Sequence, residues 1–311
     1  APLIEDLDSL PQPDYSLVHG WTKSNVYALY TSRGCPYNCK FCSVIQMFGR
    51  KYRYKSVEKT LEELRCAAKI NRSVKFIVDD NFAANRARTK EILQSLIEEK
   101  VKLRWSAQVR VEVAKDPELL RLMADSGCYN LYIGFESVNP DTLKAFNKSQ
   151  DLKDIVECIK KVKDHGIHIH GMFVLGADTD TVGTIYKTAE FASSVGIDTV
   201  QFMNLIPLPG TPFFKEMREQ KRIIHTDWSK YDGHHVVFLP KNMTPLELQL
   251  ETIRAMARFY SWGYVLRNLV HLEPFYAMLG IYAKRTIKKF TEELQDYINN
   301  FNIKALQPFS P

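Results

Sequence analysis

The chain has 311 residues, of which 45% are hydrophobic and 25% are charged. This length and composition indicate a soluble globular protein that buries a large core without disulfides. The net charge of +6 is too small to indicate nucleic-acid binding. No secretory signal is visible, and no apolar run reaches the roughly 18 residues that a membrane-spanning helix needs.

The first 25 residues carry prolines and acids with little periodicity, so they predict a lead-in segment rather than a domain. The chain begins with Ala1 instead of Met. We therefore expect that it is processed or excerpted and that something upstream is missing. An apolar run over residues 26–32 then predicts the first strand.

Residues 26 to about 206 alternate short apolar runs with helical patterns. The predicted strands cover residues 26–32, 74–79, 103–109, 129–135, 167–175 and 197–205. The predicted helices cover residues 56–70, 87–100, 116–127, 139–165 and 181–195. Successive βα units predict parallel strands with right-handed crossovers, and no seventh or eighth unit follows. The sequence therefore predicts an α/β fold, a partial (β/α)6 TIM-like barrel, with active-site residues at the C-terminal ends of its strands.

The pattern changes after Pro207. Residues 207–242 are irregular, and Thr244-Pro245 opens a long helix that runs to about residue 271. A second long helix runs from Pro274 to about residue 301. We expect three parts, which are a lead-in segment at 1–25, the partial barrel at 26–212, and an irregular segment with a C-terminal helical extension at 213–311.

The helix from Pro274 combines apolar residues at helical spacing with a cluster of basic residues. The cluster consists of Lys284, Arg285, Lys288 and Lys289. Such a helix can lie on a membrane surface. A helix that packs on the barrel or binds a partner can have the same pattern, so both interpretations stay open.

Three of the six cysteines occupy one turn-rich loop. Cys35, Cys39 and Cys42 have the spacing C-x3-C-x2-C, and no fourth cysteine is near. Structural zinc sites are usually closed by four ligands, and cubane clusters usually take four cysteines. Three thiolates would leave one iron of a [4Fe–4S] cluster open to a substrate or cofactor. A zinc knuckle or incidental cysteines are the alternatives, although zinc sites favour paired C-x2-C units and no second pair occurs.

The other three cysteines, Cys66, Cys128 and Cys158, lie far apart in the sequence. We expect them to be buried small hydrophobic side chains rather than ligands of a second cluster. An iron–sulfur loop needs reduced thiols, and a disulfide framework would be unusual in a chain of this size. The sequence therefore predicts a reducing cytoplasm, with membrane contact only through the C-terminal helix.

The cysteine spacing, with an aromatic residue just before the last cysteine, resembles the radical S-adenosylmethionine (SAM) superfamily. The resemblance implies that Cys35, Cys39 and Cys42 hold a [4Fe–4S] cluster and that Phe41 lies near the adenine of SAM. It also implies that the SAM amine and carboxylate bind the open iron. One electron would then cleave SAM to a 5′-deoxyadenosyl radical, which abstracts hydrogen from a substrate.

The first strand ends carry residues that this resemblance assigns to SAM. Asp79 and Asp80 occupy the place of the family's glycine-glycine-glutamate motif, whose backbone receives the SAM amine, but here two acids and an amide replace the glycines. A helix cap of solvated acids is the alternative interpretation. Gln108 and Arg110 end the third strand and are further candidates.

The later strand ends follow the family pattern more closely. The resemblance implies that Glu136 contacts the methionyl or ribose part of SAM and that Lys148 reaches its carboxylate. A charged group at a barrel strand end is costly unless it is paired, so Arg110 and Glu136 could instead pair with each other. Leu175 and Ile206 belong to the two strand ends that flank the adenine in the family.

The whole chain resembles the branch of cobalamin-binding radical SAM enzymes. The residues responsible are 4–14, 31–35, 79–82, 134–137 and 207–212. In that branch a cobalamin domain precedes the barrel, whereas no D-x-H-x-x-G cobalamin signature occurs here. Either the domain was removed with the missing N-terminus, which implies methyl transfer, or this member works without cobalamin, which implies radical oxidation, rearrangement or coupling.

The resemblance thus implies a radical SAM enzyme that abstracts hydrogen from an organic substrate of lipid-like or natural-product type. Its partners would be this substrate and an electron donor such as flavodoxin or ferredoxin, without nucleic acid. Cobalamin would bind only through an upstream domain, and the enzyme would then be a C-methyltransferase. An iron–sulfur or zinc scaffold without turnover is the alternative from another class. The sequence does not identify a catalytic acid or base.

Overall fold

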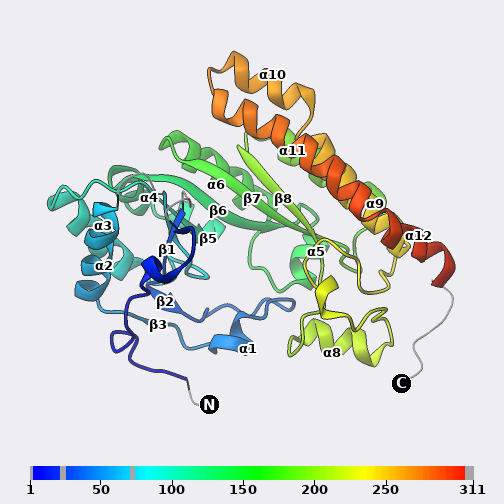
Figure 1. The fold of residues 1–311 in the computed structure, drawn as a ribbon, viewed down its shortest axis with the longest axis horizontal. Coiled ribbons are helices and arrows are strands. Elements are labelled where there is room, and N and C mark those ends of the chain that lie inside the picture. The colour runs from blue at the N-terminus through cyan, green and yellow to red at the C-terminus, as the bar shows by residue number, and fades with distance from the viewer. Residues whose placement is uncertain (1–2, 22–25, 71–73, 305–311) are drawn as a thin grey trace. The chain divides into compact units, whose positions relative to one another are not determined.

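The computed structural model describes residues 3–21, 26–70 and 74–304. Six strands form one parallel sheet whose order, β1-β4-β5-β6-β7-β8, follows the chain (Figure 1). Their bounds are Val26–Leu29, Val74–Ile77, Trp105–Val109, Cys128–Glu136, His168–Leu175 and Thr199–Asn204. This sheet and the helices between its strands confirm the predicted α/β fold, a partial (β/α)6 arrangement with C-terminal helices. The three-part division stays a prediction, and residues 1–2, 22–25, 71–73 and 305–311 lie outside the described ranges.

The helices between the strands begin at residues that can cap them. They are α2 (Val57–Lys69), α3 (Arg86–Glu98), α4 (Pro117–Asp125), α5 (Pro140–Ala145), α6 (Leu152–Asp164) and α7 (Val182–Ser194). The Ser56 side chain accepts a hydrogen bond from the Lys59 N–H at 3.0 Å, which satisfies one of the free donors at the start of α2. Asp116 caps α4 in the same way, with Pro117 at the first helical position.

Two compact units divide the chain, and each is described by itself. The first contains Ala1–Asn38, Val44–Gly134 and Lys153–His170, and the second contains Cys39–Ser43, Phe135–Leu152 and Gly171–Pro311. In the first unit, the fully buried Trp105 ring packs edge-on against Phe82. In the second unit, the rings of Phe135, Phe173 and Phe202 pack in series, with centroids 5.7 and 5.3 Å apart.

The predicted helix at 139–165 is wrong in one respect, because two helices replace it. A turn separates α5 from α6, and Asn147 in this turn has a φ of 58°. The Lys148 N–H donates to the Leu143 carbonyl at 2.9 Å, which closes the end of α5. Asparagine tolerates the left-handed conformation, so the chain can turn here and bring Lys148 next to the end of β6.

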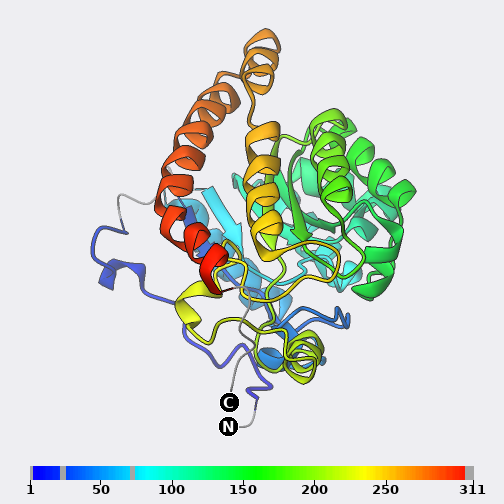
Figure 2. The same cartoon turned by 90° about the vertical axis from the view of Figure 1, so that its right-hand side faces the viewer.

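The region after Pro207 is more helical than predicted. It contains α8 (Pro212–Glu219), α9 (Pro245–Phe259), α10 (Trp262–Val270), α11 (Pro274–Glu293) and α12 (Gln295–Lys304). The single helix predicted from Pro245 to about residue 271 breaks after Phe259, because the Tyr260 hydroxyl bonds to the Val200 backbone and Ser261 caps α10. Figure 2 shows α9 and α11 side by side in the second unit, where α9 also packs on α7 and β8.

The first strand is shorter than predicted, and two small elements follow it. β1 stops at Leu29, while β2 (Ser32–Arg33) pairs antiparallel with β3 (Arg53–Tyr54). A short helix, α1 (Val44–Phe48), lies between them in sequence. The expectation that Cys66 is buried is also wrong, because its side chain is exposed on α2, whereas Cys128 and Cys158 are buried as predicted. No helix in the described ranges is long and apolar enough to cross a membrane.

Candidate functional site

Asp79 holds the residues that lead into the cysteine loop. Its buried carboxylate accepts hydrogen bonds from the N–H groups of Thr31 and Ser32 at 2.6 and 3.2 Å. Both hydroxyls also donate to it at 2.6 Å. Burial raises the pKa of Asp79, and the four hydrogen bonds oppose this rise because they stabilise the charged form. Both carboxylate oxygens are therefore used to fix the backbone shortly before Cys35.

Gly34, directly before Cys35, could not be replaced by a larger residue without strain. Its φ is 88°, and a Cβ atom at this position would lie 2.7 Å from the Lys51 carbonyl oxygen. From the other side, the buried Arg88 guanidinium donates to the Thr31 hydroxyl at 3.3 Å. The chain thus enters the cysteine loop with its backbone held by buried contacts.

Arg110, at the end of β5, contacts the cysteine loop itself. Its guanidinium lies 3.8 Å from the centre of the Tyr37 ring, two residues after Cys35. It also pairs with Glu112 at 3.0 Å, and both charged side chains are largely buried. A cation–π contact in such a partly desolvated place stabilises the position of the ring. The structure therefore brings this predicted residue to the loop.

The loop after β4 carries further polar groups. Asp80 is half-buried, and burial, followed by the charge of Asp79, raises its pKa to about 6. The side-chain oxygen of Asn81 is buried and has no hydrogen-bond partner among the described residues. The Phe82 N–H donates to the Gln108 carbonyl at 2.9 Å, which joins this loop to the end of β5. Asp79, Asp80 and Gln108 thus lie around one strand-end region of the first unit.

The second half of the cysteine loop, residues 39–43, belongs to the second unit and is held on two sides there. The Lys40 N–H donates to the Phe146 carbonyl at 3.1 Å, and the Lys40 carbonyl accepts from the Phe213 N–H at 3.2 Å. The Phe41 ring packs on the Phe146 ring, with centroids 4.8 Å apart. The backbone and the aromatic side chain of this segment are therefore fixed together.

The donor set of the loop fits an iron–sulfur cluster. The Cys42 N–H donates to the Cys39 carbonyl at 3.2 Å, so these two cysteines share one turn. Cys39 is buried, Cys35 and Cys42 are half-buried, and none of the three forms a disulfide. No group of three or more His, Cys, Asp or Glu side chains in the described residues is arranged to hold a single metal ion. Three cysteine thiols in one loop are the soft donors that iron–sulfur clusters take.

Glu136 and Lys148 form a buried ion pair at the end of β6. Their charged atoms are 2.8 Å apart, and only 10% and 5% of the two side chains are exposed. Glu136 has a φ of 63°, a conformation that non-glycine residues adopt at some cost and that is often found at functional sites. The Gln150 side chain donates to the neighbouring Phe135 carbonyl at 2.8 Å and supports this backbone. The two residues to which the resemblance assigns separate SAM contacts are thus paired with each other.

Leu175 and Ile206, predicted on the adenine side, lie at neighbouring strand ends. Both are buried, and the Leu205 N–H donates to the Leu175 carbonyl at 2.8 Å. After Leu175 the chain turns at Gly176, which has a φ of 103° and donates its N–H to the Asp180 carboxylate at 2.9 Å. The strand end at Leu175 is therefore closed by a hydrogen-bonded turn, and the Leu205 N–H joins the neighbouring strand end to it.

Sequence reasoning missed several contributors to this region. Gln150 gave no signal, because its role depends on the turn between α5 and α6. Glu216 of α8, which pairs with Lys40, could have been found. Thr211 followed by Pro212 is a typical helix start, and Thr211 indeed caps α8 by accepting a hydrogen bond from the helix.

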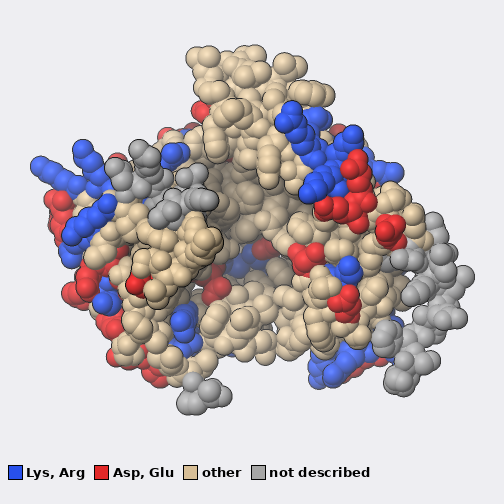
Figure 3. Space-filling view, in the orientation of Figure 1, with Lys and Arg blue, Asp and Glu red and all other residues tan. Residues whose placement is uncertain are grey.

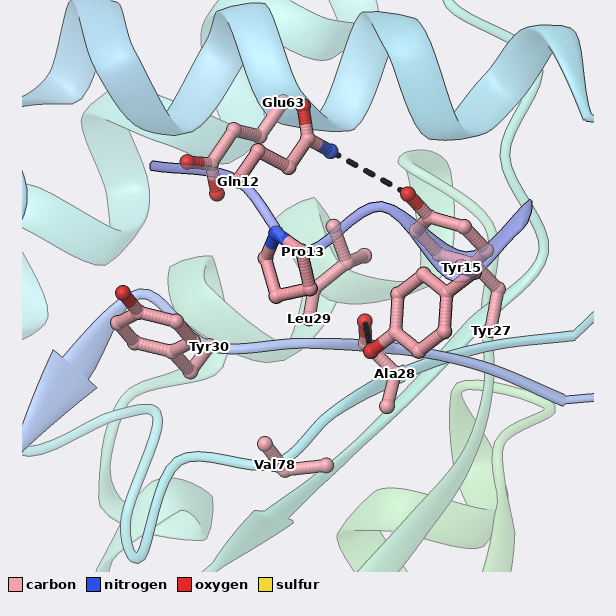
Figure 4. A pocket seen from close by; sticks show the side chains of 9 residues that line it. All are labelled: Gln12, Pro13, Tyr15, Tyr27, Ala28, Leu29, Tyr30, Glu63 and Val78. Atoms are coloured by element: carbon pink, nitrogen blue, oxygen red, sulfur yellow. Dashed lines mark hydrogen bonds between the residues drawn. The ribbon is translucent and has the colours of Figure 1, made fainter. Parts of the chain in front are cut away.

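A separate pocket lies beside β1 and contains none of the predicted site residues (Figure 4). It is lined by the lead-in segment, by β1 and by Glu63 of α2. The Tyr15 hydroxyl donates to the Ala28 carbonyl at 2.8 Å, and the Gln12 side chain donates to the Tyr27 hydroxyl at 3.3 Å. The lead-in segment is therefore packed along the edge strand of the sheet.

Comparison with known proteins adds independent information. The family model described as the radical SAM superfamily matches residues 29–192. Bacteriochlorophyllide d C-12(1)-methyltransferase of Chlorobaculum tepidum is 30% identical over 86% of this chain and 59% of its own length. The anaerobic magnesium-protoporphyrin IX monomethyl ester cyclase of Cereibacter sphaeroides is 29% identical over 84% of this chain and 44% of its own. The chain thus spans less than two thirds of either relative.

A solved structure shares the fold over most of the chain. It is that of the cobalamin-dependent S-adenosylmethionine radical enzyme OxsB with aqua-cobalamin and S-adenosylmethionine bound. The match has a TM-score of 0.59 and 16% sequence identity, and it covers 91% of this chain and 48% of that one. At this identity the likeness concerns the fold alone.

Proposed function

Because this chain belongs to the radical SAM superfamily, we propose that it holds a [4Fe–4S] cluster through Cys35, Cys39 and Cys42 and cleaves SAM there. When bound, the reduced cluster supplies one electron to SAM, which yields methionine and a 5′-deoxyadenosyl radical. The observation that carries the proposal is the construction of the cysteine loop. Buried hydrogen bonds fix the residues before Cys35, and further contacts fix those between Cys39 and Cys42.

The amine and carboxylate of SAM would be received by charged groups at the strand ends. We assign the amine to Asp80 rather than Asp79, because the Asp79 carboxylate already accepts four hydrogen bonds. We assign the SAM carboxylate to Lys148 and the ribose or methionyl part to Glu136. Their buried ion pair orients both side chains before SAM binds.

The remaining predicted residues would contact the adenine or support the loop. Phe41, Leu175 and Ile206 offer buried apolar surface, which suits a flat aromatic base. We include Gln108 and Arg110 in the proposed site because they lie at the end of β5. Arg110 supports the loop through the Tyr37 ring. These residues would orient SAM and exclude water that could quench a radical.

The substrate would be an organic molecule that loses a hydrogen atom to the radical. Relatives named for a methyltransferase and a cyclase reaction on bacteriochlorophyllide and magnesium-protoporphyrin support an organic substrate of the lipid-like or natural-product class. A low-potential electron donor such as flavodoxin or ferredoxin would reduce the cluster. An iron–sulfur loop needs reduced thiols, which suits a reducing compartment such as the cytoplasm.

A cobalamin-dependent C-methyltransferase is the second candidate function. It is favoured because one relative is named a methyltransferase, because OxsB is named cobalamin-dependent, and because the chain spans only 59% of the methyltransferase. In this case a domain outside the present chain would supply cobalamin, and the residues described above would still bind the cluster and SAM.

The proposal is tested by reconstituting the cluster anaerobically, adding SAM and a reductant, and measuring 5′-deoxyadenosine and methionine. We expect both products in equal amounts from the wild type and from Cys66→Ala, whose exposed thiol lies outside the loop. We expect neither from Cys39→Ala. A protein that carries a full cluster but cleaves no SAM would contradict the proposal, and zinc without iron after anaerobic purification would favour a scaffold.

A further inference from the structure

The second unit leaves an apolar surface uncovered on α10, on α11 and in the turn between them. Six side chains form this surface, and between 51% and 85% of each is exposed. They are Leu266, Leu269, Val270, Leu272, Phe275 and Met278, and we call them the apolar tip. Figure 3 shows the corresponding part of the molecule almost free of charged side chains. An exposed apolar patch of this kind marks an interaction site.

The opposite faces of α10 and α11 are used to hold the two helices in place. A Cβ atom on Gly280 would lie 2.8 Å from the Tyr264 ring, so the helices pack as closely as glycine allows. The Tyr264 hydroxyl donates to the Asp198 carbonyl at 2.7 Å, and Arg267 donates to the Ser193 carbonyl at 2.9 Å. The helix pair is therefore anchored to the rest of its unit, and the apolar tip is the face that remains outside.

Aromatic and basic residues follow the apolar tip in a fixed order along the helices. Trp262 and Tyr282, at 61% and 67% exposure, stand farther from the turn than the tip residues. Lys284 lies over the Trp262 ring at 5.2 Å. The basic stripe, which consists of Lys284, Arg285, Lys288 and Lys289, continues along α11, where Figure 3 shows Lys and Arg side chains beside the uncharged surface. Apolar, aromatic and basic groups in this order match the layers of a membrane interface.

We propose that the apolar tip inserts into the interfacial layer of a membrane with anionic headgroups, which the basic stripe contacts. Lys284 comes nine positions after Phe275, a rise of about 14 Å along a helix, so the tip can enter the roughly 5–10 Å of an interfacial insertion while Lys284 stays at the headgroups. The same surface is too short to span a bilayer, and no described helix could do so. This inference does not depend on the chemistry proposed above.

Charge argues for a membrane rather than a second copy of the chain. Residues 262–289 contain five Lys and Arg side chains and a single acid, Glu273, while Lys288 and Lys289 also pair with Glu292 and Glu293 at 4.0 and 3.4 Å. A second copy seated on the apolar tip would cover the apolar side chains but would leave the basic stripe, which stands farther from the turn, without an anionic partner. An anionic bilayer instead complements the stripe. Glu273 lies at the N-terminal end of α11, where the helix dipole stabilises its charge and its flexible side chain can turn toward water.

The test is co-sedimentation of the full chain with vesicles of phosphatidylcholine alone or mixed with phosphatidylglycerol. We expect at least tenfold tighter binding to the mixed vesicles, and weaker binding at high salt. The double change Leu272→Asp/Phe275→Asp should reduce binding at least tenfold, because it places charge in the tip. Leu17→Asp is the matched control, since Leu17 is 83% exposed and Leu272 is 85% exposed. Circular dichroism checks that all variants stay folded.

A second pair of variants tests the basic stripe. Lys288→Glu/Lys289→Glu should remove the preference for anionic vesicles, whereas Lys215→Glu, at a comparably exposed lysine of α8, should leave it unchanged. Failure of the wild type to bind either vesicle would overturn the inference. A dimer in solution that Leu272→Asp/Phe275→Asp converts to a monomer, without vesicle binding, would instead assign the tip to a second copy. Neither result would bear on SAM cleavage.

Discussion

Two adjacent carboxyl groups, Asp79 and Asp80, have different surroundings and therefore different roles. The Asp79 carboxylate is buried and accepts hydrogen bonds from Thr31 and Ser32, so it acts as a positioning residue for the start of the cysteine loop. Asp80 is half-buried, and its pKa is raised from the ordinary value of 3.8 to about 6. Of the two, Asp80 is the carboxyl that would gain from a bound cation.

The raised pKa of Asp80 makes a prediction about stability. A carboxyl group whose pKa is higher in the folded than in the unfolded protein makes the protein less stable as the pH rises through the pKa of the folded state. Asp80→Asn should therefore raise the free energy of unfolding by about 1 kcal/mol at pH 7.5, a value reduced for solvent screening. The difference should shrink toward pH 4.5. Urea unfolding at both pH values measures it, and a difference that grows as the pH falls would contradict the assignment.

Gly34 tests whether the entry to the loop is as constrained as its contacts indicate. Gly34→Ala should lower stability by about 2–3 kcal/mol and reduce the iron retained after reconstitution, because the new Cβ atom would press on the Lys51 carbonyl. Gly20→Ala is the control, since Gly20 also has a positive φ of 74° but has no atom within 4 Å of such a Cβ. It should lose only about 1 kcal/mol and no iron. Equal effects of the two changes would argue against a constrained entry.

At the scale of elements, the sequence predicted the strands better than the turns. The spacing of apolar residues and the helix-capping residues correctly predicted β4 to β8 and α2, α4 and α7, since these signals are local. The break between α5 and α6 could not be predicted from the sequence, because it accompanies the contact of Lys148 with Glu136. The break after α9 depends likewise on Tyr260 binding to the Val200 backbone. The candidate residues at strand ends were found through family resemblance, whereas the separate roles of Asp79 and Asp80 required the structure.

Among the ion pairs described, loss of the Glu136–Lys148 pair at the end of β6 should lower the stability of the protein most. Lys148→Met would leave the Glu136 charge buried without its partner, which should cost about 3–5 kcal/mol and weaken SAM binding. Lys51→Met removes the Lys51–Glu5 pair, whose side chains are 72% and 62% exposed, and should lower stability far less. Chemical unfolding compares the two variants. A similar small loss in both would show that the buried pair has no special weight.

At the scale of the whole molecule, the chain combines a three-cysteine loop, the strand ends that we propose to bind SAM, and an exposed helical tip. It spans 59% of the methyltransferase and 44% of the cyclase to which it is similar. In a partial parallel barrel the polar residues at the C-terminal ends of the strands lie together, where they can contact both a cofactor and a substrate.

The most direct test of the central claim is the iron and sulfide content of the reconstituted protein, with single substitutions at each cysteine. The account predicts about four irons per chain in the wild type and in Cys66→Ala. It predicts a large loss of iron in Cys35→Ala, Cys39→Ala and Cys42→Ala, with each variant still folded. Retention of a full cluster after loss of a loop cysteine, or equal loss in Cys66→Ala, would contradict the assignment of these three residues as the ligands.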